Sequence, residues 1–163
     1  MRSHSLALGL TFFGAPVLGA QTQLSGAGTC GKPDVAQAIA VRDRPNHSFS
    51  IAQTKCTWTR PFEIAGIQSK GGTGVQFDEV RDTTARFHGY YLDVMSNGDS
   101  AYYRYEGTTA LQGGAPQTAG WKWKFVGGSG KLKGLKGKGT CRATWNPSGV
   151  NTWECTGSYR LPK

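Results

Sequence analysis

Two cysteines near the carboxyl end constrain the fold of this chain more than any other feature. Cys141 and Cys155 lie at equal distances on either side of Ser148, and the segment from Asn146 to Gly149 has the composition of a β-turn. A hairpin folded about Ser148 therefore places the two cysteines directly opposite each other. The same register matches other pairs in charge, hydroxyl character or apolarity: Arg142 with Glu154, Thr144 with Thr152, and Ala143 with Trp153. This agreement predicts a disulfide between Cys141 and Cys155.

The chain has four cysteines in all, and the other two are Cys30 and Cys56. An even number in an exported chain is typical of a disulfide framework, and four cysteines allow three connectivities. With the hairpin pairing in place, Cys30 joins Cys56 by elimination and closes a loop of about 25 residues, which stabilises the fold by roughly 3 kcal/mol. The cysteines form no CxxC pair and histidines are few, so we expect no metal site and no cofactor.

Residues 1–20 have the pattern of a secretory signal peptide. Arg2 lies in a short charged start, an apolar stretch follows from Leu6 to Leu18, and two small residues end the segment. The apolar stretch is shorter than the ~20 residues that a membrane-spanning helix needs. We therefore expect residues 21–163 to form a single secreted domain, extracellular or periplasmic, without a membrane span.

Glycines punctuate the sequence. The 24 glycines separate short runs of β-branched and aromatic residues, which is typical of strands joined by turns. This pattern predicts an all-β fold of about eight strands, arranged as a closed antiparallel barrel or a sandwich. A short helical turn is expected over 35–41, because Asp34 precedes alanines there and Pro45 prevents a longer helix. The strands are expected near residues 48–58, 62–67, 75–80, 84–95, 100–108, 121–126, 138–145 and 151–159.

A second hairpin is predicted around Asn97 and Gly98. An Asn-Gly pair readily adopts the positive φ angles of a two-residue type I′ turn. Counting outward from that turn gives the expected pairs: Ser96 with Asp99, Val94 with Ala101, Leu92 with Tyr103, and Tyr90 with Tyr105. His88 shares this face of the hairpin. Because the face is largely apolar and aromatic, we predict that it points into a core or cavity.

The glycine-rich segment Phe125–Thr140 carries a family resemblance. It begins with an aromatic residue, continues with Gly127-Gly128-Ser129-Gly130, and then has an apolar residue and a glycine. This pattern resembles the turn of the allene oxide cyclase and dirigent-like barrel proteins, a calycin-like family. The resemblance implies a single eight-stranded antiparallel barrel with an apolar cavity, in a family of cofactor-free cyclases, stereochemistry-directing proteins and members without known activity. It carries over no catalytic residue, since no position outside the turn matches the family.

The first functional hypothesis is therefore a barrel that binds a small hydrophobic molecule. Such a cavity would fold its ligand by positioning, and whether it also cyclises or isomerises the ligand stays open. His88 is the candidate general acid or base, against the alternative of a purely structural histidine. The predicted ligand contacts are Tyr90, Leu92, Tyr103, Tyr105 and Trp123. A competing polar site is expected if the other hairpin face points inward: Asp93, Arg104 and Glu106.

The alternative hypothesis is a secreted module that binds a polyanion or a surface and has no catalytic activity. The formal net charge is +9, which falls to +8 without residues 1–20. The candidate contacts are four lysines in one short segment: Lys131, Lys133, Lys136 and Lys138. Lysines of this kind also form solvated turns and protect strand edges. Leu132 after Lys131 excludes a P-loop, no GxSxG turn is present, and the oligomeric state is not specified by the sequence.

Overall fold

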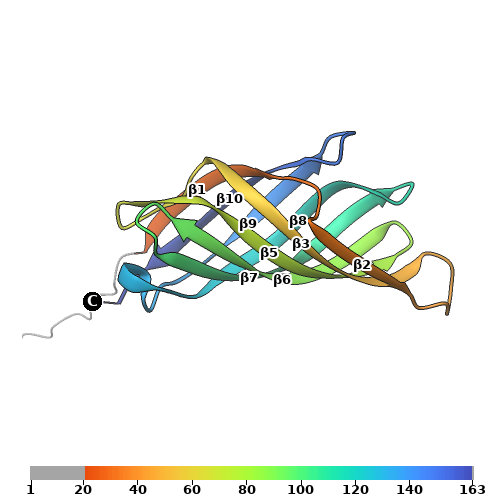
Figure 1. The fold of residues 1–163 in the computed structure, drawn as a ribbon, viewed down its shortest axis with the longest axis horizontal. Helices are drawn as coiled ribbons and strands as arrows, with labels where there is room; N and C mark the ends of the chain where they lie inside the picture. The colour runs from red at the N-terminus through yellow and green to blue at the C-terminus, as the bar shows by residue number, and fades with distance from the viewer. Residues whose placement is uncertain (1–20, 163) are drawn as a thin grey trace, which may run out of the picture.

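Nearly the whole chain that the structure describes is β-strand. The computed structural model describes residues 21–162, so the predicted signal peptide lies outside the described residues. The elements, drawn in Figure 1, are β1 (Thr22–Cys30), β2 (Val35–Ala40), β3 (His47–Arg60), β4 (Glu63–Ile64), β5 (Ile67–Arg81), β6 (Thr84–Met95), β7 (Ser100–Gln112), β8 (Ala115–Gly128), the 3₁₀ helix η1 (Gly130–Leu132), β9 (Lys136–Trp145) and β10 (Asn151–Arg160). No helix within residues 21–162 is long and apolar enough to cross a membrane.

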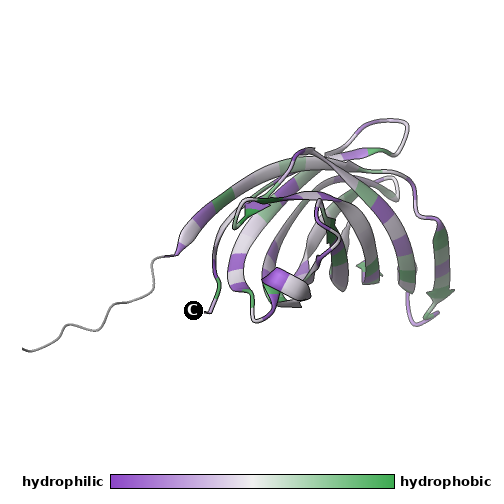
Figure 2. Cartoon of the chain, turned by 60° about the vertical axis from the view of Figure 1, so that its left-hand side comes forward, coloured by the Kyte–Doolittle hydropathy of each residue, from purple (hydrophilic) through white to green (hydrophobic). Residues whose placement is uncertain are grey.

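Eight of these strands close into an antiparallel barrel. Their order around the barrel is β3, β1, β10, β9, β8, β7, β6 and β5, and pairing of β3 with β5 completes the circle. β2 and β4 are appendages that pair with β3 and β5 respectively. Hydropathy alternates along the strands, visible in Figure 2 as bands of contrasting colour, because successive side chains point to opposite faces. The predicted all-β barrel of about eight strands is confirmed.

The amino-terminal part of the prediction was wrong. Residues 35–40 form strand β2 rather than a helical turn, with Val35 opposite Gln53 and Ala40 opposite Ser48. The edge of β3 beyond the end of β1 offers free hydrogen-bonding groups, and pairing with that edge overrides a weak local helical preference. β1 was not predicted at all, because its small residues and two glycines do not give a strand pattern on their own.

Both predicted disulfides are confirmed. Cys141 and Cys155 are directly opposite each other on β9 and β10, in the predicted register, and form one bridge. Cys30 and Cys56 are opposite on β1 and β3 and form the other. Since β1 pairs with both β10 and β3, the second bridge fixes the amino-terminal strand inside the closed barrel.

The predicted register of the β6–β7 hairpin was wrong by one residue. The Gly98 amide donates to the Met95 carbonyl and the Met95 amide donates to the Asp99 carbonyl, so three residues form the loop instead of two. Gly98 has a φ of +87°, as expected for a type I turn closed by a glycine bulge. The extra loop residue shifts each pairing, so that Tyr91 lies opposite Tyr103.

The glycine-rich segment closes one end of the barrel. Leu132 and Leu135 follow the turn and are completely buried. The turn is attached to the β6–β7 hairpin, because the Ser100 amide donates to Ser129 Oγ at 2.8 Å and the Lys131 amide donates to Asp99 Oδ2 at 3.0 Å. Gly130 has a φ of +51°, and a Cβ there would collide with the Asp99 carboxylate. The segment therefore closes this end of the barrel, and we call it the plug.

Candidate functional site: an aromatic cavity inside the barrel

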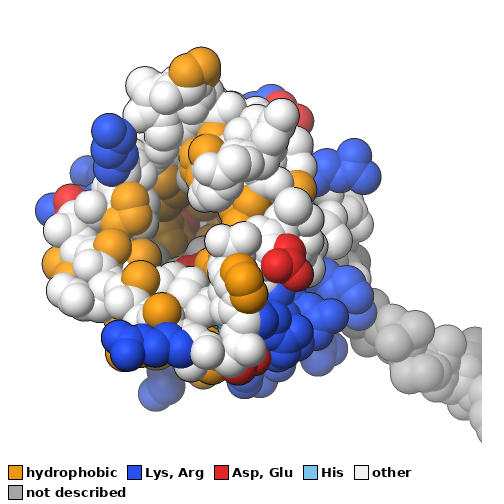
Figure 3. Space-filling view, turned by 90° about the vertical axis from the view of Figure 1, so that its right-hand side faces the viewer, with side chains coloured by type: hydrophobic (Ala, Val, Ile, Leu, Met, Phe, Trp, Pro, Cys, Tyr) orange, Lys and Arg blue, Asp and Glu red, His pale blue; other side chains and the backbone are white. Residues whose placement is uncertain are grey.

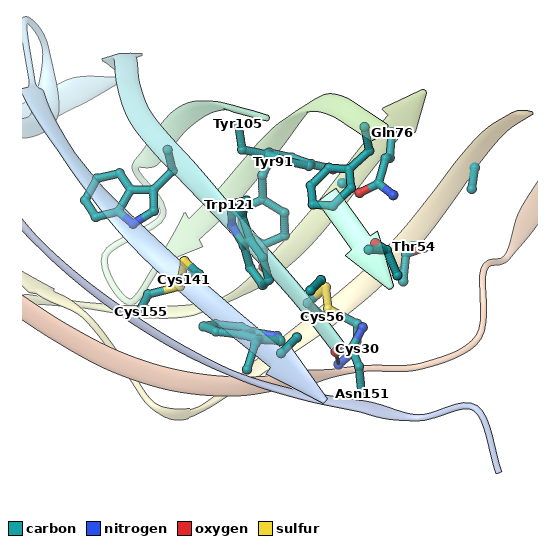
Figure 4. A pocket seen from close by; sticks show the side chains of 18 of the residues that line it. Cys30, Thr54, Cys56, Gln76, Tyr91, Tyr105, Trp121, Cys141, Asn151 and Cys155 are labelled. Atoms are coloured by element: carbon teal, nitrogen blue, oxygen red, sulfur yellow. Dashed lines mark hydrogen bonds between the residues drawn. A yellow bond between two sulfur atoms is a disulfide. The ribbon is translucent and has the colours of Figure 1, made fainter. Parts of the chain in front are cut away.

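The barrel encloses a cavity of about 310 Å³. Its walls combine tryptophan, tyrosine and phenylalanine rings with both disulfides, as Figure 4 shows from close by. All five tryptophans of the chain contribute to the lining: Trp58, Trp121, Trp123, Trp145 and Trp153. Phe62, completely buried, lies at the end nearer the plug. A cavity of this size is at the lower limit of the roughly 300–1,000 Å³ typical of ligand pockets.

Inward-facing glycines make room for the large rings. The Trp123 ring lies against the backbone of Gly139 and Gly157, and a Cβ at either position would collide with it. Tyr105 lies in the same way against Gly89, where a Cβ would be 2.6 Å from the Tyr105 hydroxyl oxygen. Much of the glycine content therefore lies within strands, where it permits close approach of aromatic rings to the barrel wall.

The cavity opens toward the end of the barrel opposite the plug. Figure 3 looks onto this end and shows a hollow with hydrophobic side chains inside it. A wider vestibule surrounds the opening and includes Arg42, Asn46 and Asp82. The residues that line both the vestibule and the inner cavity form the neck between them: Gln76, Asp78, Thr109 and Trp145.

Three residues that line the cavity carry a hydrogen-bond donor without a partner among residues 21–162. The donors are the Tyr91 hydroxyl and the indole N–H groups of Trp123 and Trp153, all buried. Burial raises the pKa of Tyr91 above the ordinary range for a tyrosine, so its hydroxyl keeps its proton. A buried donor without an acceptor costs about 1–3 kcal/mol. The donor atoms are covered by neighbouring side chains, so a ligand that brings hydrogen-bond acceptors would reach them when the cavity wall adjusts around it.

Asp78 is the carboxylic acid of the cavity lining, in the neck of the barrel. Gln76 donates to it from Nε2 at 2.8 Å. Burial raises the pKa of Asp78, and the hydrogen bonds from Gln76 and Ser50 oppose that rise only partly. The group can therefore hold or accept a proton next to a bound molecule.

A second carboxyl group, Asp93, points into the barrel interior next to the residues that line the cavity, and it is completely buried. Trp58 donates to its Oδ1 from Nε1 at 3.0 Å, and the Tyr103 hydroxyl donates to its Oδ2 at 3.4 Å. Burial raises the pKa of Asp93 to about 6, although hydrogen bonds from Ser69, Trp58, Tyr103 and the Gly71 backbone act in the opposite direction. Asp93 thus holds two cavity-lining aromatic side chains.

No model of a known protein family matches the chain, and no curated protein matches it. Among the solved structures that match the chain are two at low identity. A protein of unknown function from the DUF3224 family of Shewanella oneidensis MR-1 has 11% sequence identity and a TM-score of 0.46, with 88% of this chain and 100% of that chain covered. The pterocarpan synthase dirigent protein GePTS1 has 11% identity and a TM-score of 0.48, with 92% and 98% covered. The predicted relation to allene oxide cyclases stays a prediction.

The structure brings three of the five predicted ligand contacts into the cavity wall: Tyr103, Tyr105 and Trp123. Tyr90 and Leu92 lie on the outer surface, with 54% and 44% of each residue exposed. His88 is also outside and stacks on Phe77, with ring centroids 5.4 Å apart. The prediction that the His88 face points inward was therefore wrong, because the extra loop residue places the odd-numbered residues of β6 inside.

The competing polar site does not form either. Asp93 points inward, whereas Arg104 and Glu106 are exposed on the outer face of β7. No group of three or more His, Cys, Asp or Glu residues in the described range 21–162 is arranged to hold a metal ion.

The cavity residues that the sequence prediction missed share a readable signal. In β9 and β10, Cys141, Trp145 and Trp153 are spaced at even intervals from the predicted bridge, so strand alternation places them on one face. Because cysteine and tryptophan are among the residues most buried in proteins, a face that carries both is expected to be the inner one. The inward-facing residues of β6 could not be assigned in this way, because β6 has no cysteine and the turn after it does not fix the register.

Proposed function

We propose that this chain is a small-molecule-binding barrel whose cavity holds a flat, mainly apolar ligand with hydrogen-bond acceptors. The observation that carries the proposal is the combination of an aromatic cavity with three buried, unpaired donors, Tyr91, Trp123 and Trp153. Aromatic walls offer large apolar contact areas and ring stacking. The donors add orientation, because a ligand oxygen aimed at one of them removes the cost of an unsatisfied group.

The same cavity supports a cofactor-free isomerisation or cyclisation as an extension of binding. The rigid aromatic walls would hold the ligand in one folded conformation, which lowers the entropic part of the barrier. Asp78 is the side chain in the lining best suited to hold or accept a proton, since burial raises its pKa. We further propose that the protein acts outside the cytoplasm, where two disulfides are stable.

A matched pair of probes tests the binding proposal. 9-Fluorenone and fluorene share one flat tricyclic skeleton, and only the ketone carries a hydrogen-bond acceptor. Binding of both probes is measured by equilibrium dialysis, which reports the two affinities independently of their different optical properties. The ketone should bind about 3- to 10-fold more tightly, the equivalent of one hydrogen bond.

Two tyrosine variants provide the control. Tyr91→Phe removes an unpaired hydroxyl inside the cavity, whereas Tyr90→Phe removes a hydroxyl on the outer surface. Tyr91→Phe should reduce the preference for the ketone, and Tyr90→Phe should leave it unchanged. Trp123→Phe and Trp153→Phe remove the other two unpaired donors in the same way. The proposal would be contradicted if neither probe bound, or if the preference for the ketone were the same in wild type and in all three cavity variants.

A further inference from the structure

The positive charge of the chain is concentrated on one part of the barrel. Residues 100–163 contain ten of the 19 lysines and arginines but only two of the ten acidic residues. The described part of this segment forms the contiguous strands β7 to β10 and helix η1. Figure 3 shows Lys and Arg side chains gathered along one side of the barrel, outside the hollow.

Strand pairing places these basic residues in rows on the outer surface. Arg104, Lys124 and Lys138 are successive partners across β7, β8 and β9, and all three are exposed. Neighbouring strands are about 4.8 Å apart, and residues two apart along a strand are separated by about 6.7 Å. Other exposed basic residues on β7 to β10 and on the adjoining turn extend this row into a surface, which we call the basic face. In full, it consists of Arg104, Lys122, Lys124, Lys131, Lys133, Lys136, Lys138, Arg142 and Arg160.

The basic face is not neutralised by the protein itself. The ion pairs found in residues 21–162 involve Asp34, Asp43 and Glu79, which all lie in the first half of the chain. Glu106 and Glu154 are opposite Lys122 and Arg142 in the strand register, yet neither forms an ion pair within 4.0 Å. Nine cations against three neighbouring acids, Asp99, Glu106 and Glu154, leave a positive surface that attracts anions.

The surroundings of the cations favour a polysaccharide over a nucleic acid. Single-stranded nucleic acids bind through aromatic side chains on which bases stack, in addition to lysines. The neighbouring tryptophans Trp121 and Trp123 point inward and line the cavity. The exposed rings beside the cations, Tyr90 and Tyr102, lie at the β6–β7 edge of the basic face, where Arg104 covers Tyr90, so strands β8 to β10 present no outward aromatic ring. Hydroxyl side chains lie between the cations instead: Thr140, Thr156 and Ser158.

We propose that the basic face binds an anionic polysaccharide through its sulfate or carboxylate groups. The lysines act as point charges at a spacing of about 5–7 Å, and the hydroxyls accept or donate hydrogen bonds to the sugar. This site is separate from the cavity, because its side chains point to the outside of the same strands. It would hold the barrel on a polymer while the cavity remains open at the barrel end.

The test compares two triple variants that lose the same charge. Lys122→Gln/Lys124→Gln/Lys138→Gln removes the centre of the basic face. Lys32→Gln/Lys55→Gln/Lys70→Gln removes three exposed lysines from other elements. Binding to heparin, to polygalacturonate, to neutral dextran and to single-stranded DNA is measured by titration at several salt concentrations.

We expect wild type to bind heparin or polygalacturonate in about 0.1 M salt, with an affinity that falls as salt rises. Polygalacturonate carries carboxylates only, so binding to it would show that carboxylates suffice, whereas binding to heparin alone would show that sulfates or a higher charge density are required. The first triple variant should bind at least about 10-fold more weakly with a shallower salt dependence, and the second within about 2-fold of wild type. Equal losses in both variants, no binding to either polysaccharide, or tighter binding to DNA would overturn the proposal.

Discussion

Asp93 makes the stability of this barrel depend on pH in a direction opposite to that of most carboxylates. In the native chain it is completely buried, and burial raises its pKa to about 6 from an ordinary value of 3.8. In the unfolded chain the group returns to its ordinary value, so between these two pH values the native state binds more protons than the unfolded state. The free energy of unfolding therefore falls as pH rises through this range.

The magnitude follows from the two values. A rise from 3.8 to about 6 corresponds to roughly 3 kcal/mol of stability that is present below about pH 4 and lost above about pH 6. Asp93→Asn has no proton to lose, and its amide oxygen can still accept from Trp58 Nε1 while its NH₂ group donates to the Tyr103 oxygen. The variant should therefore gain stability relative to wild type as pH rises, by roughly 3 kcal/mol in all.

Urea unfolding of wild type and Asp93→Asn, followed by tryptophan fluorescence from pH 4 to 8, measures this difference directly. Taking the difference between the two proteins cancels the other titrating groups. Asp82→Asn, on the exposed turn between β5 and β6, is the control and should show a much smaller change with pH. The reasoning would be refuted if the difference in free energy of unfolding between the two proteins did not vary with pH, or if wild type gained stability relative to Asp93→Asn as pH rose. Such a result would show that the hydrogen bonds outweigh burial.

Two further predictions concern packing and cross-linking. Gly139→Ala should lower the free energy of unfolding by about 1–3 kcal/mol or more in chemical denaturation, because its Cβ would collide with the Trp123 ring and the Thr156 carbonyl. Gly120→Ala, on β8 with open space around its Cβ, should change stability by less than about 0.5 kcal/mol, and equal effects would contradict the packing described. Replacing Cys30 and Cys56 together by Ala should cost about 3–4 kcal/mol, seen as a lower thermal midpoint. An unchanged midpoint would show that the bridge does not constrain the barrel.

The parts of the fold that could be predicted are those where independent signals agree. Around Ser148, turn chemistry, cysteine pairing and an Arg142–Glu154 match all specify one register, which the structure has. The strand pattern and the glycine-rich segment then led to a closed barrel, although the eight predicted strands include 62–67, where the structure has only the short β4, and omit β1. Agreement of this kind is what makes one register much more favourable than its neighbours.

The parts that failed depend on choices that local sequence does not determine. An Asn-Gly pair suits both a two-residue turn and the three-residue loop found at Gly98, and the apolar residues on both faces of β6 do not distinguish them. Tyr90 and Leu92 look like core residues but lie outside, while Asp93 looks like a surface residue but is buried. β1 and β2 are strands because neighbouring strands supply their hydrogen-bond partners, which no local pattern reports.

The central claim is that the aromatic cavity is a ligand site, and a crystal structure of the protein soaked with 9-fluorenone tests it most directly. The account predicts the ketone inside the barrel, with its rings against the tryptophans and its oxygen within hydrogen-bond distance of Tyr91 Oη, Trp123 Nε1 or Trp153 Nε1. A cavity that stays empty at saturating ketone, or a ketone bound on the outer surface beside Tyr90, would contradict it.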